Sequence, residues 1–241
     1  MNGFYSSFEK IFVENGLSQY VAPDTAKQFE LLFELLKDAN EKFNLTSISS
    51  EEDVIFKHFA DCATVLGYIP ENSKVLDVGT GGGFPSFPIA ILRPDTDVLA
   101  IDSTEKKIRY VNETADSLTL DNLEALTARA EDLAKNKKYF QKFDIVISRA
   151  VGNLRILSEL CIPFVKLGGS FIAMKGPSAH NELEEAKNAY KTLGCELVSD
   201  NGITLKNNGD SLDRHILIFK KTKPTPPAYP RAFSQMTKKP L

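Results

Sequence analysis

The sequence predicts an α/β protein in which a helical extension precedes a mostly parallel seven-stranded sheet that ends in an antiparallel hairpin. Three observations predict this fold. After residue 73, five short apolar runs alternate with helical patterns, which is typical of βαβ units. Four glycines follow the first run within five residues, at positions 79, 81, 82 and 83. Near the end of the chain, two further strand-like stretches leave no room for a helix between them.

The first 68 residues carry helical patterns. Apolar residues recur there at three- and four-residue steps, which makes one apolar stripe on a helix: Phe29, Leu32, Phe33, Leu36, Ala39 and Phe43. Pro23 and Asp24 suit the start of this helix. A second helical stretch runs from about residue 51 to 66, with three acids in its first turn, where the helix dipole favours them. We therefore expect a helical extension over residues 1–68.

The sheet domain is expected over residues 69–221. Its parallel strands are predicted at 74–78, 97–101, 123–127, 143–148 and 170–175. Helices are predicted between them, near 86–92, 104–118, 153–165 and 178–193. The last two strands, 196–205 and 215–220, are joined by residues 206–210 and form the hairpin at one sheet edge.

Length and composition limit the function classes. With 241 residues, 42% of them hydrophobic and 25% charged, the chain has the composition of an ordinary globular protein. No apolar run reaches the roughly 18 residues of a membrane span, and no signal peptide is recognisable. Cys62, Cys161 and Cys195 lie far apart in apolar contexts without metal-ligand spacing. We expect a cytoplasmic, monomeric protein with reduced cysteines, no metal site and no membrane partner.

The last 20 residues, 222–241, form a basic, proline-rich tail. From Arg214 to Leu241 there are seven lysines or arginines and no acid, which leaves 22 bases against 32 acids in the rest of the chain. Such asymmetry favours contact with an anionic partner. A solvated, disordered tail is the alternative, and residues 224–230 are expected to be extended.

The glycine cluster predicts the bound ligand. A dinucleotide fold requires Gly-x-Gly-x-x-Gly, and Phe84 stands at the third glycine position. Asp77 precedes Gly79 and Gly81 instead, and this acid-x-Gly-x-Gly-x-Gly pattern resembles the S-adenosylmethionine loop of class I methyltransferases. A dinucleotide brings a pyrophosphate, whereas the methyl donor brings a sulfonium and an ammonium group, beside which an acid is favourable. Asp102 ends the second strand, where its carboxylate can accept both ribose hydroxyls, although it can also cap the following helix.

The end of the fourth strand constrains the methyl acceptor. It reads Ile-Ser-Arg-Ala-Val over residues 147–151, with neither the Pro-Pro-aromatic motif used on exocyclic amines nor the cysteine used on pyrimidine carbons. A ring nitrogen such as N7 of guanine needs neither, because its lone pair attacks directly and positioning supplies the catalysis.

Several motifs together resemble the bacterial 16S rRNA guanine-N7 methyltransferase family, also called glucose-inhibited division protein B. Besides the glycine loop, these are Asn40 to Thr46 (Asn-x-x-x-Asn-Leu-Thr), His58 to Asp61 (His-x-x-Asp), residues 148–150 (Ser-Arg-Ala), residues 174–176 (Met-Lys-Gly) and residues 229–231 (Tyr-Pro-Arg). The resemblance covers nearly the whole chain. It implies a class I fold and methyl transfer from S-adenosylmethionine to N7 of a guanine, at position 527, in 16S rRNA of the small ribosomal subunit.

The resemblance also implies the site residues. The family's donor-binding positions fall on five residues: Gly79, Phe84, Ala130, Glu131 and Arg149. Arg149 is expected above the methyl group, and Asp61 is the candidate carboxylate that stabilises the cationic product. His58 either stacks on the base or satisfies a helix contact. Phosphate contacts are expected from the tail and from Lys106, Lys107, Arg109, Lys135, Lys137, Lys138 and Lys175.

This chain departs from the family at three places. Ala39 stands where tryptophan is common, Cys62 replaces a serine, and the tail reads Ala-Phe-Ser-Gln-Met over residues 232–236 rather than a Gly-x-Pro form. Two alternatives stay open: a class I methyltransferase acting on a small molecule, and a non-catalytic ribosome-assembly factor.

Overall fold

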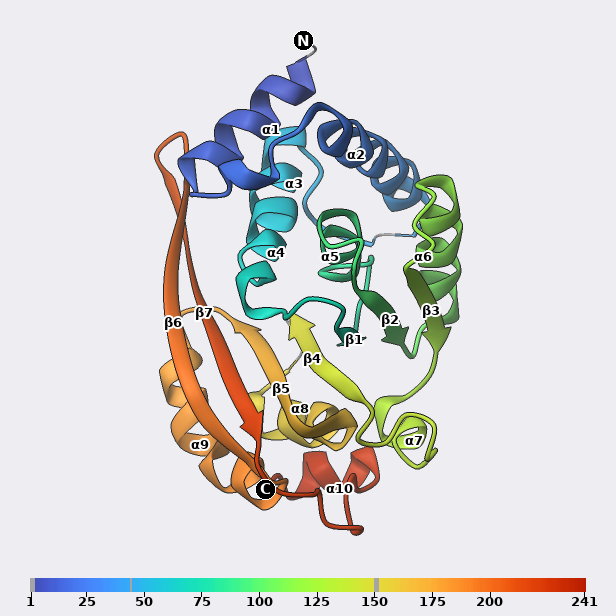
Figure 1. The fold of residues 1–241 in the computed structure, drawn as a ribbon, viewed down its shortest axis with the longest axis vertical. Coiled ribbons are helices and arrows are strands. Elements are labelled where there is room, and N and C mark those ends of the chain that lie inside the picture. The colour runs from blue at the N-terminus through green and yellow to red at the C-terminus, as the bar shows by residue number, and fades with distance from the viewer. Residues whose placement is uncertain (1–2, 44, 150–151) are drawn as a thin grey trace.

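The computed structural model describes residues 3–43, 45–149 and 152–241. Asn44, Ala150 and Val151, which belong to two of the motifs above, lie outside the described residues. The centre of the molecule is one seven-stranded sheet in the order β3-β2-β1-β4-β5-β7-β6 (Figure 1). Strands β1 to β5 pair in parallel, and β7 runs antiparallel to both β5 and β6. The predicted fold class is confirmed.

The strand positions follow the apolar runs closely. The strands are β1 (Lys74–Val78), β2 (Asp97–Asp102), β3 (Leu123–Thr127), β4 (Phe143–Arg149), β5 (Val165–Lys175), β6 (Cys195–Asn207) and β7 (Asp210–Lys221). The hairpin is longer than predicted because a two-residue turn closes it. Asn208 and Gly209 both have positive φ, 50° and 90°, as the right-handed strand twist favours in such turns.

Helices cover both faces of the sheet. The helices of the sheet domain and tail are α5 (Ser86–Leu92), α6 (Glu105–Ser117), α7 (Ala130–Leu133), α8 (Leu154–Cys161), α9 (Ala179–Thr192) and α10 (Phe233–Lys238). Neighbouring strand residues alternate between two hydrophobic clusters: Val75 packs with α5 and α6, whereas Leu76 packs with α8 and α9. The helix predicted to reach residue 165 ends at Cys161, and Pro163 lies in a 3-10 turn before β5.

The helical extension forms an extra layer on the α5 side of the sheet (Figure 1). It contains α1 (Gly3–Glu14), α2 (Pro23–Phe43) and a continuous helical stretch made of α3 (Glu51–Val54), a π-helical turn (Ile55–Ala60) and α4 (Asp61–Ala63). The rings of Phe8, Phe29 and Phe59 pack in series, with centroids 5.2 and 4.7 Å apart. The Phe59 ring in turn lies 6.1 Å from the Phe84 ring, so the predicted apolar stripe on α2 is connected through Phe59 to the sheet domain. Among the described helices, none has the length and apolar character needed to span a bilayer.

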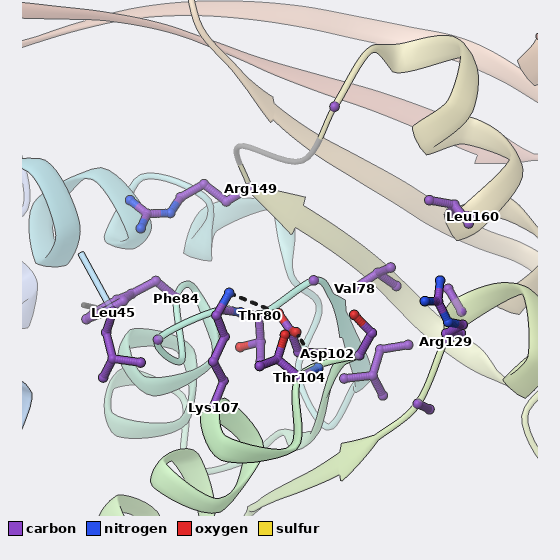
Figure 2. A pocket seen from close by; sticks show the side chains of 18 of the residues that line it. Leu45, Val78, Thr80, Phe84, Asp102, Thr104, Lys107, Arg129, Arg149 and Leu160 are labelled. Carbon is purple, nitrogen blue, oxygen red and sulfur yellow. Dashed lines mark hydrogen bonds and ion pairs between the residues drawn. The ribbon is translucent and has the colours of Figure 1, made fainter. Parts of the chain in front are cut away.

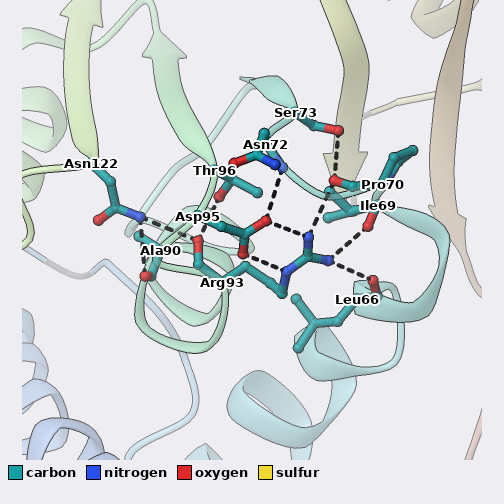
Figure 3. A network of polar contacts seen from close by, with 10 residues as sticks. All are labelled: Leu66, Ile69, Pro70, Asn72, Ser73, Ala90, Arg93, Asp95, Thr96 and Asn122. Atoms are coloured by element: carbon teal, nitrogen blue, oxygen red, sulfur yellow. Dashed lines mark hydrogen bonds and ion pairs between the residues drawn. The ribbon is translucent and has the colours of Figure 1, made fainter.

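A polar network fastens the end of the extension to the sheet domain (Figure 3). The Arg93 guanidinium donates to the carbonyls of Ile69 and Pro70 and makes two hydrogen bonds to Asp95 at 2.8 and 2.7 Å. Asp95 also accepts the Asn72 amide hydrogen at 2.9 Å. These contacts hold the pKa of Asp95 well below its usual value. The connection into β1 is thereby fixed at the sheet end opposite the glycine loop.

The C-terminal tail docks against α8. Glu159 on α8 is 1% exposed and accepts the backbone and side-chain Nε hydrogens of Arg231, both at 2.8 Å. Arg155 donates to the carbonyls of Pro240 and Leu241 at 2.9 and 2.8 Å, and the Met236 side chain is fully buried. The tail is therefore an ordered part of the fold, and residues 233–238 form helix α10.

Candidate methyl-transfer site

A cavity of about 640 Å³ opens at the carboxyl ends of β1, β2 and β4 (Figure 2). Ligands bind at this edge in open α/β sheets because the strand order reverses there. Seven of the predicted site residues line it: Gly79, Gly81, Phe84, Asp102, Ala130, Glu131 and Arg149. Leu45, Phe84 and Arg149 lie toward one side in Figure 2, Asp102 and Thr104 in the middle, and Arg129 and Leu160 toward the other.

The glycine loop needs its glycines for two different reasons. Gly79, Gly81 and Gly83 have φ of 79°, 58° and 88°, a region that side chains rarely adopt. A Cβ at Gly83 would lie 2.1 Å from the Phe87 ring, so this glycine permits packing inside the loop. A Cβ at Gly81 would meet nothing within 4 Å, because this glycine faces the open cavity. Gly79 and Gly81 line the ligand space, whereas Gly83 supports it.

Asp77 does not line the cavity, which differs from the predicted cofactor contact. Its side chain is fully buried, and Oδ2 accepts the Ser86 hydroxyl at 2.6 Å, while Oδ1 has no partner among the described residues. Burial raises its pKa to about 6. Asp77 therefore stabilises the glycine loop through Ser86, because the Ser86 hydroxyl also contacts the Thr80 hydroxyl at 3.1 Å.

Asp102 hydrogen-bonds to the glycine loop and to the residue that precedes α6. Oδ2 accepts the Gly81 amide hydrogen at 3.1 Å, and Oδ1 accepts the Thr104 amide hydrogen at 2.9 Å, which organises the start of α6. Lys107 Nζ lies 3.9 Å from Oδ2. Each carboxylate oxygen has more than one lone pair, so both can still accept a hydroxyl from the cavity.

Beyond Asp102, α7 and the tail enclose the cavity. Ala130 and Glu131 begin α7, and both are more than 90% buried, as their shared place after β3 predicts. Arg129 Nη1 lies 3.8 Å from Glu131 Oε1. Leu160 from α8 and Phe233 from α10 complete this end. Sequence reasoning missed Leu160 and Phe233, because only the docking of α8 and α10 brings them to the cavity.

At the other end, an aromatic stack meets a guanidinium. The His58 ring stacks on Phe84 with centroids 4.6 Å apart, and the Arg149 guanidinium carbon lies 5.5 Å from the Phe84 ring centre. Leu36, Leu45 and Thr46 from the extension line the same end. His58 is 7% exposed, so of the two roles predicted for it the structure shows the internal contact.

Arg149 is held by the extension. Its Nη1 donates to the Lys57 carbonyl and to Asp61 Oδ2, both at 3.1 Å, and its Nη2 donates to His58 Nδ1 at 2.9 Å. The π-helical turn supplies two of these partners and places Asp61 directly after it. Because a guanidinium only donates, His58 Nδ1 is the acceptor and Nε2 carries the ring proton toward Thr46 Oγ1, 3.0 Å away.

Asp61 does not reach the cavity, which corrects its predicted contact with the product. Its carboxylate is fully buried between two arginines, with Oδ2 on Arg149 and Oδ1 on Arg214 Nε at 2.9 Å. It is a positioning residue for Arg149. Sequence reasoning missed Arg214, which lies 153 residues from Asp61 in the chain.

Protonation at this end is set by burial. Desolvation and the neighbouring arginines lower the pKa of His58 to about 3, so the ring is neutral. Asn40 Oδ1 accepts the Thr46 amide hydrogen at 2.8 Å, which orders the loop below His58. Burial raises the pKa of Cys62 to about 12, so this thiol offers no nucleophilic thiolate. At this end of the cavity, the described residues therefore position groups, while His58 is a weak base and Cys62 is no nucleophile.

Two other clusters lie away from the cavity lining. His180 and His215 both contact the Asp200 carboxylate, at 3.3 and 2.7 Å, and their potential ligand atoms all lie within 4.8 Å of one another. His215 is hydrogen-bonded to Asp200, and His180 lies within ion-pair distance of the same carboxylate. Lys175, predicted to contact phosphate, is 6% exposed and ion-paired with Glu182 at 2.8 Å. It is therefore a structural residue.

Comparisons with known proteins agree with this geometry. The family model described as GidB, rRNA small subunit methyltransferase G, matches residues 25–216. A relative of that name from Clostridium perfringens (strain SM101 / Type A) is 46% identical over 221 residues, 90% of this chain and 91% of the relative. Another, from Lactobacillus helveticus (strain DPC 4571), is 41% identical over 238 residues, 97% of this chain and 98% of the relative.

Solved structures share the fold at low sequence identity. M. jannaschii TYW2 in complex with AdoMet superposes with a TM-score of 0.53 at 17% identity, over 67% of this chain and 74% of that chain. A chain from the complex of the Haloferax volcanii Trm112 methyltransferase activator and the putative methyltransferase gives a TM-score of 0.57 at 13% identity, over 78% of this chain and 98% of that chain. These likenesses support the class I methyltransferase fold.

Proposed function

This chain belongs to the rRNA small subunit methyltransferase G family, and from that premise we propose that it methylates N7 of a guanine in 16S rRNA with S-adenosylmethionine as donor. The observation that carries the proposal is the continuous cavity. One end of the cavity is lined by the glycine loop and Asp102, a suitable place for a nucleoside. The other end is lined by Phe84, His58 and Arg149, together with residues of the helical extension.

The donor half of the cavity fits S-adenosylmethionine. Gly79 and Gly81 would leave room for the amino-acid portion, Asp102 would accept the ribose hydroxyls, and Ala130 and Glu131 would adjoin the adenine. The cavity volume of about 640 Å³ lies in the range of small-molecule sites. Bound here, the donor supplies an electrophilic methyl group on a sulfonium. The glycine loop presents no phosphate-binding lysine, and the carboxylates of Asp102 and Glu131 suit a cationic ligand.

The acceptor half supports attack by a ring nitrogen. N7 of guanine carries no proton, so the reaction needs no general base, and the neutral His58 and the buried Cys62 provide none. Arg149 keeps Nε–H and one Nη2–H without a partner among the described residues. These donors can bind guanine O6, beside N7, and thereby hold N7 in line with the methyl group. Asp61 balances the guanidinium charge near the cationic product.

The experiment is methyl transfer from tritiated S-adenosylmethionine to purified small subunits and to free 16S rRNA. We expect label in the rRNA, followed by strand cleavage at a single guanine after borohydride and aniline, a chemistry selective for 7-methylguanine. Label on another base type would contradict the proposed acceptor atom. Donor binding without labelled RNA would favour the assembly-factor alternative, and label only in a low-molecular-weight acceptor would favour the small-molecule alternative.

A further inference from the structure

We propose that Phe233, the first residue of α10, is a donor-specificity residue that contacts the adenine of bound S-adenosylmethionine. The docked C-terminal tail then completes the donor site. This inference rests on the proposed function for the identity of the donor. It assigns a purpose to the segment 232–236, where this chain departs from the Gly-x-Pro form of the related tails.

Phe233 lies at the donor end of the cavity. It lines the same cavity as Asp102, Ala130 and Leu160, although it comes from the last nine residues of the chain. Its side chain is 41% exposed, one of six large hydrophobic residues left exposed among the described residues. None of the other five, such as Val198 at 63%, is in the lining of this cavity. A partly exposed aromatic ring in the lining of this cavity offers a face on which the base of a bound nucleoside can stack.

The tail holds Phe233 in place. Arg231, two residues earlier, is bonded to the buried Glu159, and Met236, three residues later, is fully buried beneath α10. Arg155 holds the last two carbonyls of the chain. The ring is therefore fixed before the ligand arrives, which lowers the entropic cost of binding. α8 carries both Glu159 and Leu160, so one helix anchors the tail and lines the cavity beside it.

The chemistry of this end selects a flat apolar ring. Ala130 and Leu160 offer apolar surface and Phe233 offers a π-face, while Arg129 and Glu131 add polar groups that suit the nitrogen-bearing edge of a base. Stacking a base on an aromatic side chain changes affinity roughly 5- to 150-fold when the ring is replaced by alanine. Because the proposed contact is to the base and not to the methionine portion, its loss should weaken the binding of free adenosine as well.

The first test measures binding by calorimetry, with S-adenosylhomocysteine and adenosine as probes. We expect Phe233→Ala to weaken both by about 10-fold, since the lost contact is common to both probes. Val198→Ala on the hairpin is the matched control, because it also trims an exposed apolar side chain, and its affinities stay unchanged. Unchanged affinity in Phe233→Ala overturns the inference. Failure of the unaltered protein to bind S-adenosylhomocysteine overturns the proposed function instead.

The second test uses fluorescence, because the chain contains no tryptophan. Phe233→Trp places the sole indole at the proposed contact, and titration with S-adenosylhomocysteine should shift or quench its emission with the same midpoint as calorimetry gives. Val198→Trp, with its indole on the hairpin, should not respond. A silent Phe233→Trp variant that binds the probe by calorimetry would place the adenine elsewhere.

Discussion

At the residue scale, Arg149 and its three partners define the acceptor end. The guanidinium contacts the Lys57 carbonyl, His58 and Asp61, which all lie on one helical stretch of the extension. Lysine has neither the planar fork nor the number of donors needed to keep these contacts while also reaching into the cavity. The residue therefore links the extension to the strand that ends at the reaction site.

Arg149→Lys should lower kcat by on the order of 100-fold while leaving donor affinity within a few-fold, because positioning is lost and the donor half stays intact. Steady-state methylation of small subunits and calorimetry with S-adenosylhomocysteine measure the two quantities. Arg109→Lys on α6 is the control and should behave like the unaltered protein, because it keeps the exposed positive charge that was predicted to contact phosphate. Equal kcat in the Arg149 and Arg109 variants would remove Arg149 from the mechanism.

His58 predicts a pH dependence of stability. Its pKa is lowered from 6.5 to about 3 in the fold, so the unfolded chain takes up a proton that the folded chain refuses. Its contribution to stability is complete above pH 6.5 and is lost as pH falls from there toward 3. At pH 5 the loss amounts to about 2 kcal/mol. Urea unfolding of His58→Gln should show a shallower decline between pH 7 and pH 5, and an unchanged slope would contradict this cause.

At the scale of elements, two glycines of the same loop have different roles: Gly83 allows close packing, and Gly81 leaves room in the cavity. Gly83→Ala forces a Cβ into the Phe87 ring and should cost at least about 2 kcal/mol of unfolding free energy. Gly81→Ala meets only open space and should cost about 1 kcal/mol for its strained φ. The Gly81 variant, although more stable, should lose donor affinity because its methyl group enters the cavity. Denaturant unfolding and calorimetry check the pair, and equal stability losses would refute the distinction.

The tail makes a second prediction at this scale. Arg231→Met removes the partner of the buried Glu159 and should destabilise the protein by about 2 kcal/mol, since Arg231 itself is partly exposed. Glu159→Gln combined with Arg231→Met should recover part of that loss, because no buried charge is then left unpaired. Thermal unfolding measures both variants. If the double variant is no more stable than Arg231→Met, the ion pair is not the anchor of the tail.

Local sequence patterns predicted the strands and the residues at the donor half of the cavity. The roles of the other site residues depend on contacts between distant segments, which local patterns do not show. Gly79, Gly81 and Asp102 could be predicted to line the cavity because they lie at or just after the carboxyl ends of β1 and β2. The roles of Asp61 and Asp77 were misjudged, because an acid near a motif gives no sign of whether neighbouring side chains bury it. Arg149 is bonded to His58 across 91 residues, a pairing that no sequence period reveals.

At the scale of the whole molecule, charge is less asymmetric than the sequence suggests. Of the seven bases after residue 213, Arg214 and Arg231 are ion-paired with buried acids, and Lys221 is 1% exposed. The four exposed bases are Lys220, Lys223, Lys238 and Lys239. Over residues 214–241, four of the seven bases therefore remain available to an anionic partner, and three of these four lie in the tail.

These four lysines should govern the salt dependence of rRNA binding. Changing Lys238 and Lys239 to Gln should reduce the slope of log K against log salt by about one per lysine that contacts phosphate. Filter binding of 16S rRNA between about 50 and 200 mM salt measures the slope. Lys27→Gln and Lys187→Gln, which remove exposed bases already paired with acids, serve as the control. Identical slopes in all variants would exclude the tail from phosphate contact.

The first helix and the last hairpin are bonded to each other at the top of Figure 1. Asn15 donates to the Lys206 carbonyl and accepts its amide hydrogen, at 2.9 and 2.7 Å, across 191 residues. During synthesis, α1 therefore leaves the ribosome long before Lys206 has been made. Until then, the side of the N-terminal layer that contacts the hairpin stays exposed. A nascent chain of this design therefore completes its N-terminal layer only after the hairpin around residue 206 has emerged.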